Sequence, residues 1–293
     1  MLSVQVTSNA RKIVDIHAQC TGISIDTFLN CGNTTACGTQ FYPPHTAPTG
    51  ATSRIVGGRE AVPHSWPWMV LLRFRTSTLS CGGTLIRTCT DELVVVTAAQ
   101  CVEGTLAADW QIDVGVHSRS ANEVNQKAYQ VSEIHVHENF SASYLLSDIA
   151  ILRLSTPVQE NTDVTPICVT SLPIEDFYGK NCVVTGWGVT MENGALADKL
   201  KEVYKPILPN SECLTNIGGA FNPDHMTCAG YLEGGKGACQ GDQGGPLACF
   251  NSQGKYDLIG IVSWGFGCAR EGFPAVYANV HKYLDWIASH AST

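Results

Sequence analysis

The sequence predicts an all-β protein, folded as a sandwich or a barrel. Short runs rich in β-branched residues recur from residue 55 onward, separated by Gly, Pro and Asn, a spacing typical of these architectures. The runs occupy residues 68–74, 93–97, 149–154, 183–187, 258–264 and 275–280. Helical periodicity is confined to 281–290, where Leu284, Ile287 and Ala288 fall on one face with Trp286 near its edge. We therefore expect one terminal helix beside the sheets.

The composition indicates a globular protein and argues against two classes of partner. The chain has 293 residues, of which 44% are hydrophobic and 15% charged, enough for a sizeable core. Its formal net charge is −8, with 18 Lys+Arg and no basic run, which argues against nucleic acid or an anionic membrane surface as partner. The longest apolar stretch, at 93–99, is too short to span a bilayer.

The cysteines predict an extracellular location. Thirteen of them are spread over the whole length, as in proteins that fold in an oxidising compartment. A zinc protein is disfavoured, because there is no CxxC pair and the histidines do not cluster near cysteines. No signal peptide is visible in the chain, since the first residues, MLSVQVTSNARKIV, lack an apolar core of the required length. We give the cysteines more weight.

Residues 1–54 differ from the rest and are expected to form a separate N-terminal segment. They hold Cys20, Cys31 and Cys37, and end in a Pro/Thr/Gly-rich stretch at 42–53 that is typical of a solvated linker. The globular domain then comprises residues 55–293.

Two sequons predict glycosylation of a secreted protein. They are Asn33-Thr34-Thr35 and Asn139-Phe140-Ser141. Such triplets also arise by chance, so both outcomes stay open at each site.

Six motifs together resemble the chymotrypsin/trypsin family of serine proteases. They are RIVGG at 54–58, TAAQC at 97–101, SDIAIL at 147–152, GDQGGP at 241–246, SWG at 263–265 and PAVYANV at 274–280. The resemblance covers residues 55 to about 290. It implies two six-stranded antiparallel β-barrels, at about 70–165 and 175–280, with the active site between them and a C-terminal helix packed against the body.

The resemblance also implies a disulfide framework. The implied pairs are Cys81 with Cys101, Cys182 with Cys249, Cys213 with Cys228, and Cys239 with Cys268. Cys168 occupies the place where some members tether a propeptide, and Cys37 is its expected mate, which leaves Cys20 to pair with Cys31. Cys89 remains, either as a buried thiol or as half of a disulfide to another chain.

The catalytic triad of the family is incomplete in this sequence. Asp148 stands at the position of the triad acid, but Gln100 replaces the histidine and Gln243 replaces the serine. A carboxamide neither shuttles protons near neutral pH nor attacks a carbonyl. The chain is therefore predicted to be a pseudoprotease rather than an enzyme. The backbone N–H groups of Gly241 and Gln243 are still expected to form an oxyanion-type nest.

Further family positions predict an activation switch. The Arg54-Ile55 bond resembles the cleavage site of a trypsin-like activating protease, after which the Ile55 amino group would pair with Asp242. Cleavage is either a working switch or a feature retained without use.

The specificity pocket is expected to be neutral and shortened. Gly237 lies at its floor where trypsins have an aspartate, Gly265 keeps one wall open, and Ala275 shortens it, so a medium apolar side chain would fit. Ser263 is expected to hydrogen-bond Asp148. No cofactor is expected, and no metal either, because the calcium loop of some members needs a carboxylate near Val116 and Glu123 alone is weak evidence.

The sequence leaves three functions open. The first is a secreted, inactive serine protease homologue that binds proteins, as a protease cofactor, an inhibitor decoy or a recognition factor. The second is a serine endopeptidase with chymotrypsin- or elastase-like preference. The third is a storage or structural protein.

Overall fold

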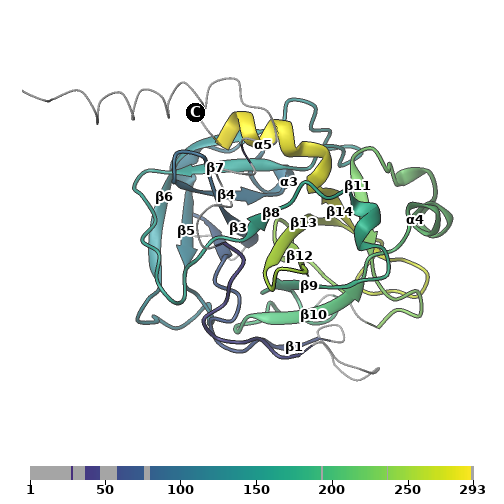
Figure 1. Ribbon diagram of the computed structural model, residues 1–293, viewed down its shortest axis with the longest axis horizontal. Coiled ribbons are helices and arrows are strands. Elements are labelled where there is room, and N and C mark those ends of the chain that lie inside the picture. The colour runs from purple at the N-terminus through teal and green to yellow at the C-terminus, as the bar shows by residue number, and fades with distance from the viewer. Residues whose placement is uncertain are drawn as a thin grey trace, which may run out of the picture.

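A computed structural model describes residues 28, 37–46, 58–75, 80–192, 194–235 and 237–291. Several predicted features lie outside these residues: Arg54 and Ile55 of the activation site, the sequon at Asn33, and the pair Cys20 and Cys31. The two bodies of the fold lie side by side in Figure 1, with the C-terminal helix across the top.

The first body is a closed six-stranded antiparallel barrel with strand order β2-β3-β4-β7-β6-β5. Its strands are β2 (Met69–Phe74), β3 (Ser80–Arg87), β4 (Leu93–Thr97), β5 (Trp110–Val114), β6 (Lys127–Val136) and β7 (Ala150–Leu154). In β6, Tyr129 and Val131 are buried whereas Ala128 and Gln130 are exposed. This alternation with a period of two places one face of the strand in the core.

The second body is a sheet of eight strands in which β8 joins β13 in parallel and the remaining pairs are antiparallel. The path β1-β10-β9-β12-β13-β14-β11 comprises β1 (Arg59–Glu60), β9 (Asn181–Gly186), β10 (Lys201–Pro206), β11 (Met226–Ala229), β12 (Pro246–Phe250), β13 (Tyr256–Trp264) and β14 (Ala275–Asn279), and β8 is Cys168–Val169.

This second body closes less regularly than the first. Beyond the end of β10, Ile207 makes an isolated antiparallel bridge to Ala229 of β11. The flanking bonds run from Leu208 N–H to Cys228 O (3.0 Å) and from Gly230 N–H to Pro206 O (3.1 Å). Pro206 has no N–H to return a second bond to Gly230, so the ladder is weakened on that side of the bridge. The predicted second barrel is therefore present, but its last seam is a short one.

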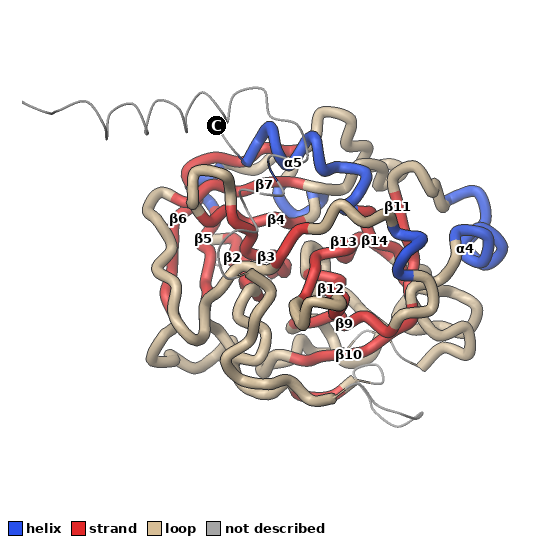
Figure 2. Tube along the Cα trace, viewed as in Figure 1, coloured by secondary structure: helices blue, strands red, loops and turns tan. Residues whose placement is uncertain are grey.

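The helices α4 and α5 lie at the edges of the two bodies (Figure 2). The α-helices are α3 (Ala99–Val102), α4 (Asn210–Ile217) and α5 (Leu284–Ala291), and the 3-10 helices are Ala107–Asp109, Ile174–Phe177, Gly218–Ala220 and Val280–Tyr283. The predicted terminal helix is confirmed, with Leu284, Trp286, Ile287 and Ala288 buried. None of the helices in the described ranges has the length and apolar character needed to span a bilayer.

Five disulfides join cysteines within the described part of the chain. They join Cys37 to Cys168, Cys81 to Cys101, Cys182 to Cys249, Cys213 to Cys228, and Cys239 to Cys268, which are the pairs that the resemblance implies. Beside the first of them, Tyr256 N–H donates to Gly38 O (2.8 Å), so the N-terminal segment is fastened to β13. The Cys89 thiol lies 3.8 Å from the carbonyl oxygen of Phe28, where the same segment meets the first barrel.

Candidate functional site

The three triad positions meet at the junction of the two barrels. Gln100 lies on α3, directly after β4, and Asp148 lies directly before β7. Because β4 and β7 are paired, with Thr97 opposite Ala150, the two side chains are brought together. Gln243 comes from the loop before β12, and its carbonyl accepts the N–H of Gly82 in β3 (2.8 Å). That bond joins the second body to the first.

Asp148 is buried, with 1% of its surface exposed, and its carboxylate is surrounded by donors. Oδ1 accepts the backbone N–H of Gln100 (2.9 Å), and Oδ2 accepts the Ser263 hydroxyl (2.5 Å). Burial raises the pKa of Asp148, and the hydrogen bonds from Ser263 and Gln100 oppose this rise. The predicted contact with Ser263 is therefore present, and the triad acid keeps a fixed orientation.

The Gln100 carboxamide completes the shell around Asp148. Its Nε2 donates to Asp148 Oδ2 and to the backbone carbonyl of Ser263 (2.9 Å). Both N–H donors of the amide group thus have acceptors. The side chain holds the carboxylate as a permanent donor, and it has no lone pair on nitrogen that could take a proton from a nucleophile. The arrangement stabilises Asp148 without providing a general base.

The Gln243 side chain folds back onto its own loop. Its Oε1 accepts the backbone N–H of Gly241 at 2.7 Å. The nest expected at Gly241 and Gln243 stays a prediction, and in this structure the Gly241 donor is engaged by the Gln243 side chain. A docking carbonyl would have to displace the amide oxygen first.

Asp242 points into the second body, away from solvent, with 4% of its surface exposed. Oδ1 accepts the Gly188 N–H (2.8 Å), and Oδ2 accepts the Cys239 N–H (2.9 Å). Burial raises its pKa to about 6, against the influence of these two donors and of Lys205. Its pairing with the Ile55 amino group stays a prediction, because Ile55 lies outside the described residues.

The residues predicted to form the specificity pocket line two adjoining cavities. Ser263, Gly265 and Ala275 line an outer cavity of about 50 Å³, together with Gln243. Gly237, Gly265 and Ala275 line an inner cavity of about 10 Å³. The pocket is shallow, as expected. It is not neutral, however, because the inner cavity is also lined by the fully buried Lys205.

Sequence reasoning missed Lys205, although a signal was present. In the strand sequence KEVYKP, Val203 and Lys205 are two residues apart and therefore share one face. The apolar Val203 marks this face as inward, so the lysine occupies an inward position. A cation at an inward position of a buried strand is unusual and marks a candidate site.

A family model described as trypsin matches residues 55–287 of the chain. The chain belongs to the trypsin family. It is 40% identical to trypsin-1 of Astacus astacus over 246 residues, which are 81% of this chain and 100% of that protein. It is 36% identical to the proclotting enzyme of Tachypleus tridentatus over 253 residues, which are 82% of this chain and 66% of that protein.

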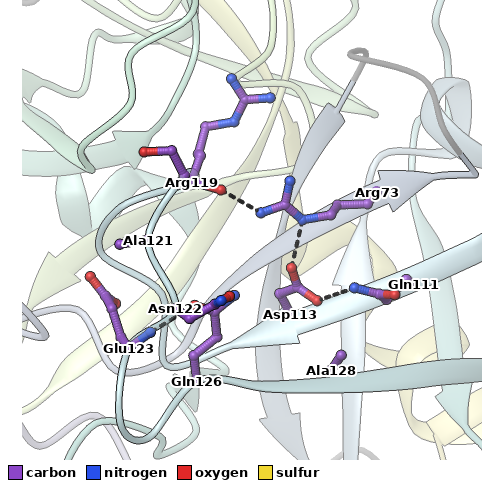
Figure 3. Close-up of a pocket in the computed structure, with 10 residues that line it drawn as sticks. Arg73, Gln111, Asp113, Arg119, Ala121, Asn122, Glu123, Gln126 and Ala128 are labelled. Atoms are coloured by element: carbon purple, nitrogen blue, oxygen red, sulfur yellow. Dashed lines mark hydrogen bonds and ion pairs between the residues drawn. The ribbon is translucent and has the colours of Figure 1, made fainter.

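A larger pocket of about 400 Å³ on the first barrel of this trypsin-family domain is lined mainly by polar residues (Figure 3). Arg73 donates to Asp113 Oδ2 (2.6 Å) and to the carbonyl of Arg119 (2.9 Å), and Gln111 donates to Asp113 Oδ1 (2.7 Å). Arg73 and Asp113 therefore satisfy one another, and the pocket contributes nothing to the triad.

The loop before β6 shows how Glu123 is used. Its carboxylate accepts the N–H groups of His117 (2.6 Å) and Ser118 (3.0 Å), so it holds the two ends of the loop 117–123 together. Across the part of the chain that the structure covers, no group of three or more His, Cys, Asp or Glu side chains is arranged to hold a metal. Of the two predicted sequons, the one at Asn139 lies within the described residues. Asn139 is exposed, and its glycosylation stays a prediction.

Proposed function

We propose that this trypsin-family chain is a secreted, catalytically inactive homologue that acts as a binding or regulatory protein. The observation that carries the proposal is the state of the two carboxamides. Gln100 is bonded to Asp148 and to the Ser263 carbonyl, while Gln243 occupies the Gly241 N–H. Gln100 Nε2 and Gln243 Oε1 each make hydrogen bonds within the fold, and neither carboxamide is a general base or a nucleophile.

The rate expected without a triad is also low. Serine proteases without a functional triad retain about 10³–10⁴-fold acceleration over water, from binding and the oxyanion hole. Enzymes commonly achieve about 10⁶-fold or more. In this chain the acceleration that an oxyanion hole alone could supply is also reduced, because Gln243 Oε1 competes for the Gly241 donor. Turnover at a useful rate is therefore not expected.

The preserved framework supports a role as a binding protein. The disulfides, the buried Asp148 and the buried Asp242 all maintain the two-barrel scaffold. The disulfides also support an extracellular location. The partners we propose are proteins: a protease, an inhibitor or a receptor.

The experiment is a search for activity in the purified full chain, before and after treatment with trypsin. A broad peptide library and a serine-directed phosphonate probe are used in parallel. We expect neither turnover nor labelling above the level of a sample whose Asp148 is changed to Asn. Activity that copurifies with the chain and is lost in Asp148→Asn would contradict the proposal.

The alternative is a working endopeptidase, and the relatives favour it, since one is named trypsin-1 and another proclotting enzyme. The double variant Gln100→His with Gln243→Ser separates the two functions. If the scaffold is otherwise competent, the double variant gains peptidase activity that the natural chain lacks. Peptidase activity of the natural chain that is above background and equals that of the double variant would favour the alternative.

A further inference from the structure

A buried ammonium group lies at the inner end of the pocket. Lys205, near the end of β10, has 0% of its surface exposed. Its Nζ donates to the Tyr277 hydroxyl of β14 (3.1 Å) and lies 5.8 Å from the centre of the same ring. Burying a cation in a protein interior is costly, so a lysine in this position is unexpected unless an anion or a polar group compensates it.

The lysine lines the inner of the two cavities that make up the pocket. Ala238, Gly265, Gly267 and Ala275 line both the inner cavity, which contains Lys205, and the outer one. The two spaces therefore lie one behind the other. A side chain that enters beside Gln243 would point toward the lysine. The outer cavity of about 50 Å³ has room for a short side chain only.

The ammonium group has donor capacity left over. An ammonium has three N–H donors, and in the described part of the chain the acceptor bonded to Nζ is the Tyr277 hydroxyl. Burial lowers the pKa of Lys205 to about 8, while Asp242 opposes this change. The group is therefore mainly protonated at neutral pH. Asp242 directs its oxygens to the Gly188 and Cys239 N–H groups.

We propose that the pocket accepts an acidic side chain of a partner protein, and that Lys205 is the residue that determines this preference. The inference rests on the proposed function, in that the occupant is a docked segment rather than a cleaved substrate. It replaces the expectation of an apolar occupant, because an apolar side chain would offer no acceptor to the N–H donors of Lys205 that Tyr277 leaves over.

The dimensions indicate how the charge is sensed. The inner cavity of about 10 Å³ is the size of about one water molecule. A carboxylate in the outer cavity can therefore be linked to Nζ through one bridging water, which is nearly as favourable as a direct hydrogen bond. A short acid fits this arrangement, whereas a basic side chain is repelled by it.

The test measures binding of capped peptides to the full chain by titration calorimetry. The probes are acetyl-Ala-Ala-Ala-Xaa-amide peptides in which Xaa is Asp, Asn or Leu. We expect the Asp peptide to bind at least about tenfold more tightly than the Asn peptide, as for a charge-assisted hydrogen bond. In Lys205→Met this ratio falls to about one. Lys201→Met, in the same strand and with the same change in net charge, keeps it.

A second measurement needs no variant. In the natural chain, the affinity of the Asp peptide relative to that of the Asn peptide is expected to fall as the pH rises from 7 to above the Lys205 pKa of about 8. The groups facing the lysine do not change over this range, since the pKa of Asp242 is about 6 and burial raises the pKa values of Tyr277 and Tyr231 above their ordinary value. This result keeps the test decisive even if Lys205→Met fails to fold.

The outcomes separate the two proposals. Tighter binding of the Leu peptide, no binding of the Asp peptide at millimolar concentration, or an Asp preference that survives in Lys205→Met would each overturn the role of Lys205. Cleavage of a probe during the titration would instead contradict the inactive scaffold, whatever the ranking of the peptides.

Discussion

Replacing Gln100 by Ala is expected to destabilise the protein rather than to change any activity. The substitution removes the Nε2 donor of Asp148 and of the Ser263 carbonyl. A hydrogen bond to a charged group contributes about 1.5–3 kcal/mol and one to a neutral group about 0.5–1.5 kcal/mol. Water that enters the space left by the side chain restores part of both. We expect the free energy of unfolding to fall by about 2 kcal/mol at pH 7.

The pH dependence provides a sharper signature. The pKa of Asp148 is raised in the folded protein, so the folded state binds this proton more tightly than the unfolded chain does. Such a group lowers the free energy of unfolding as the pH rises from its unfolded pKa of about 3.9 through its folded pKa. Loss of the Gln100 donor raises the folded pKa further. The deficit of Gln100→Ala is therefore expected to shrink toward about 1 kcal/mol as the pH falls below the unfolded pKa of about 3.9 and Asp148 takes up its proton in both proteins.

The assay is urea unfolding with the disulfides intact, compared at pH 7 and below pH 4. The midpoint should fall with no change in the slope, and thermal midpoints should fall by about 2–4 °C for each kcal/mol. The control is Gln253→Ala, at an exposed turn position, for which no change is expected. A deficit that is absent at pH 7, or is equal at both pH values, would refute the reasoning.

Three further results are expected. Because burial raises the pKa of Asp242 to about 6, Asp242 lowers stability as the pH rises from about 4 to 6, and Asp242→Asn should flatten this part of the unfolding profile; an unchanged slope would count against it. Gly188→Ala places a Cβ 2.5 Å from the Asp242 carboxyl carbon, so calorimetry should show a loss of about 1–3 kcal/mol. After cleavage at Arg54, the Cys37–Cys168 disulfide should keep the two pieces in one band on a non-reducing gel and release them on reduction; separation without reductant would exclude the tether.

Much of the fold follows from local features of the sequence. Runs of β-branched residues determine where strands form, and the apolar face of 281–290 determines where the last helix packs. The loss of the catalytic imidazole and hydroxyl is likewise a matter of residue identity, and Gln100 and Gln243 reveal it without coordinates. The short seam of the second barrel, a bridge between Ile207 and Ala229, depends on the tertiary packing of β10 against β11, and the missing N–H of Pro206 limits it on one side.

The sequence by itself determined which chemistry the site lacks, and the tertiary structure decided what the remaining groups do. That Gln243 caps Gly241 depends on the turn between them, and that Gln100 serves Asp148 depends on the pairing of β4 with β7. The pocket floor shows the difference most clearly. Lys205 lies more than thirty residues before Gly237 and seventy-two before Tyr277, and only the packing of β10 beneath the pocket brings them together. Charge in a cavity is set by which side chains converge there in space.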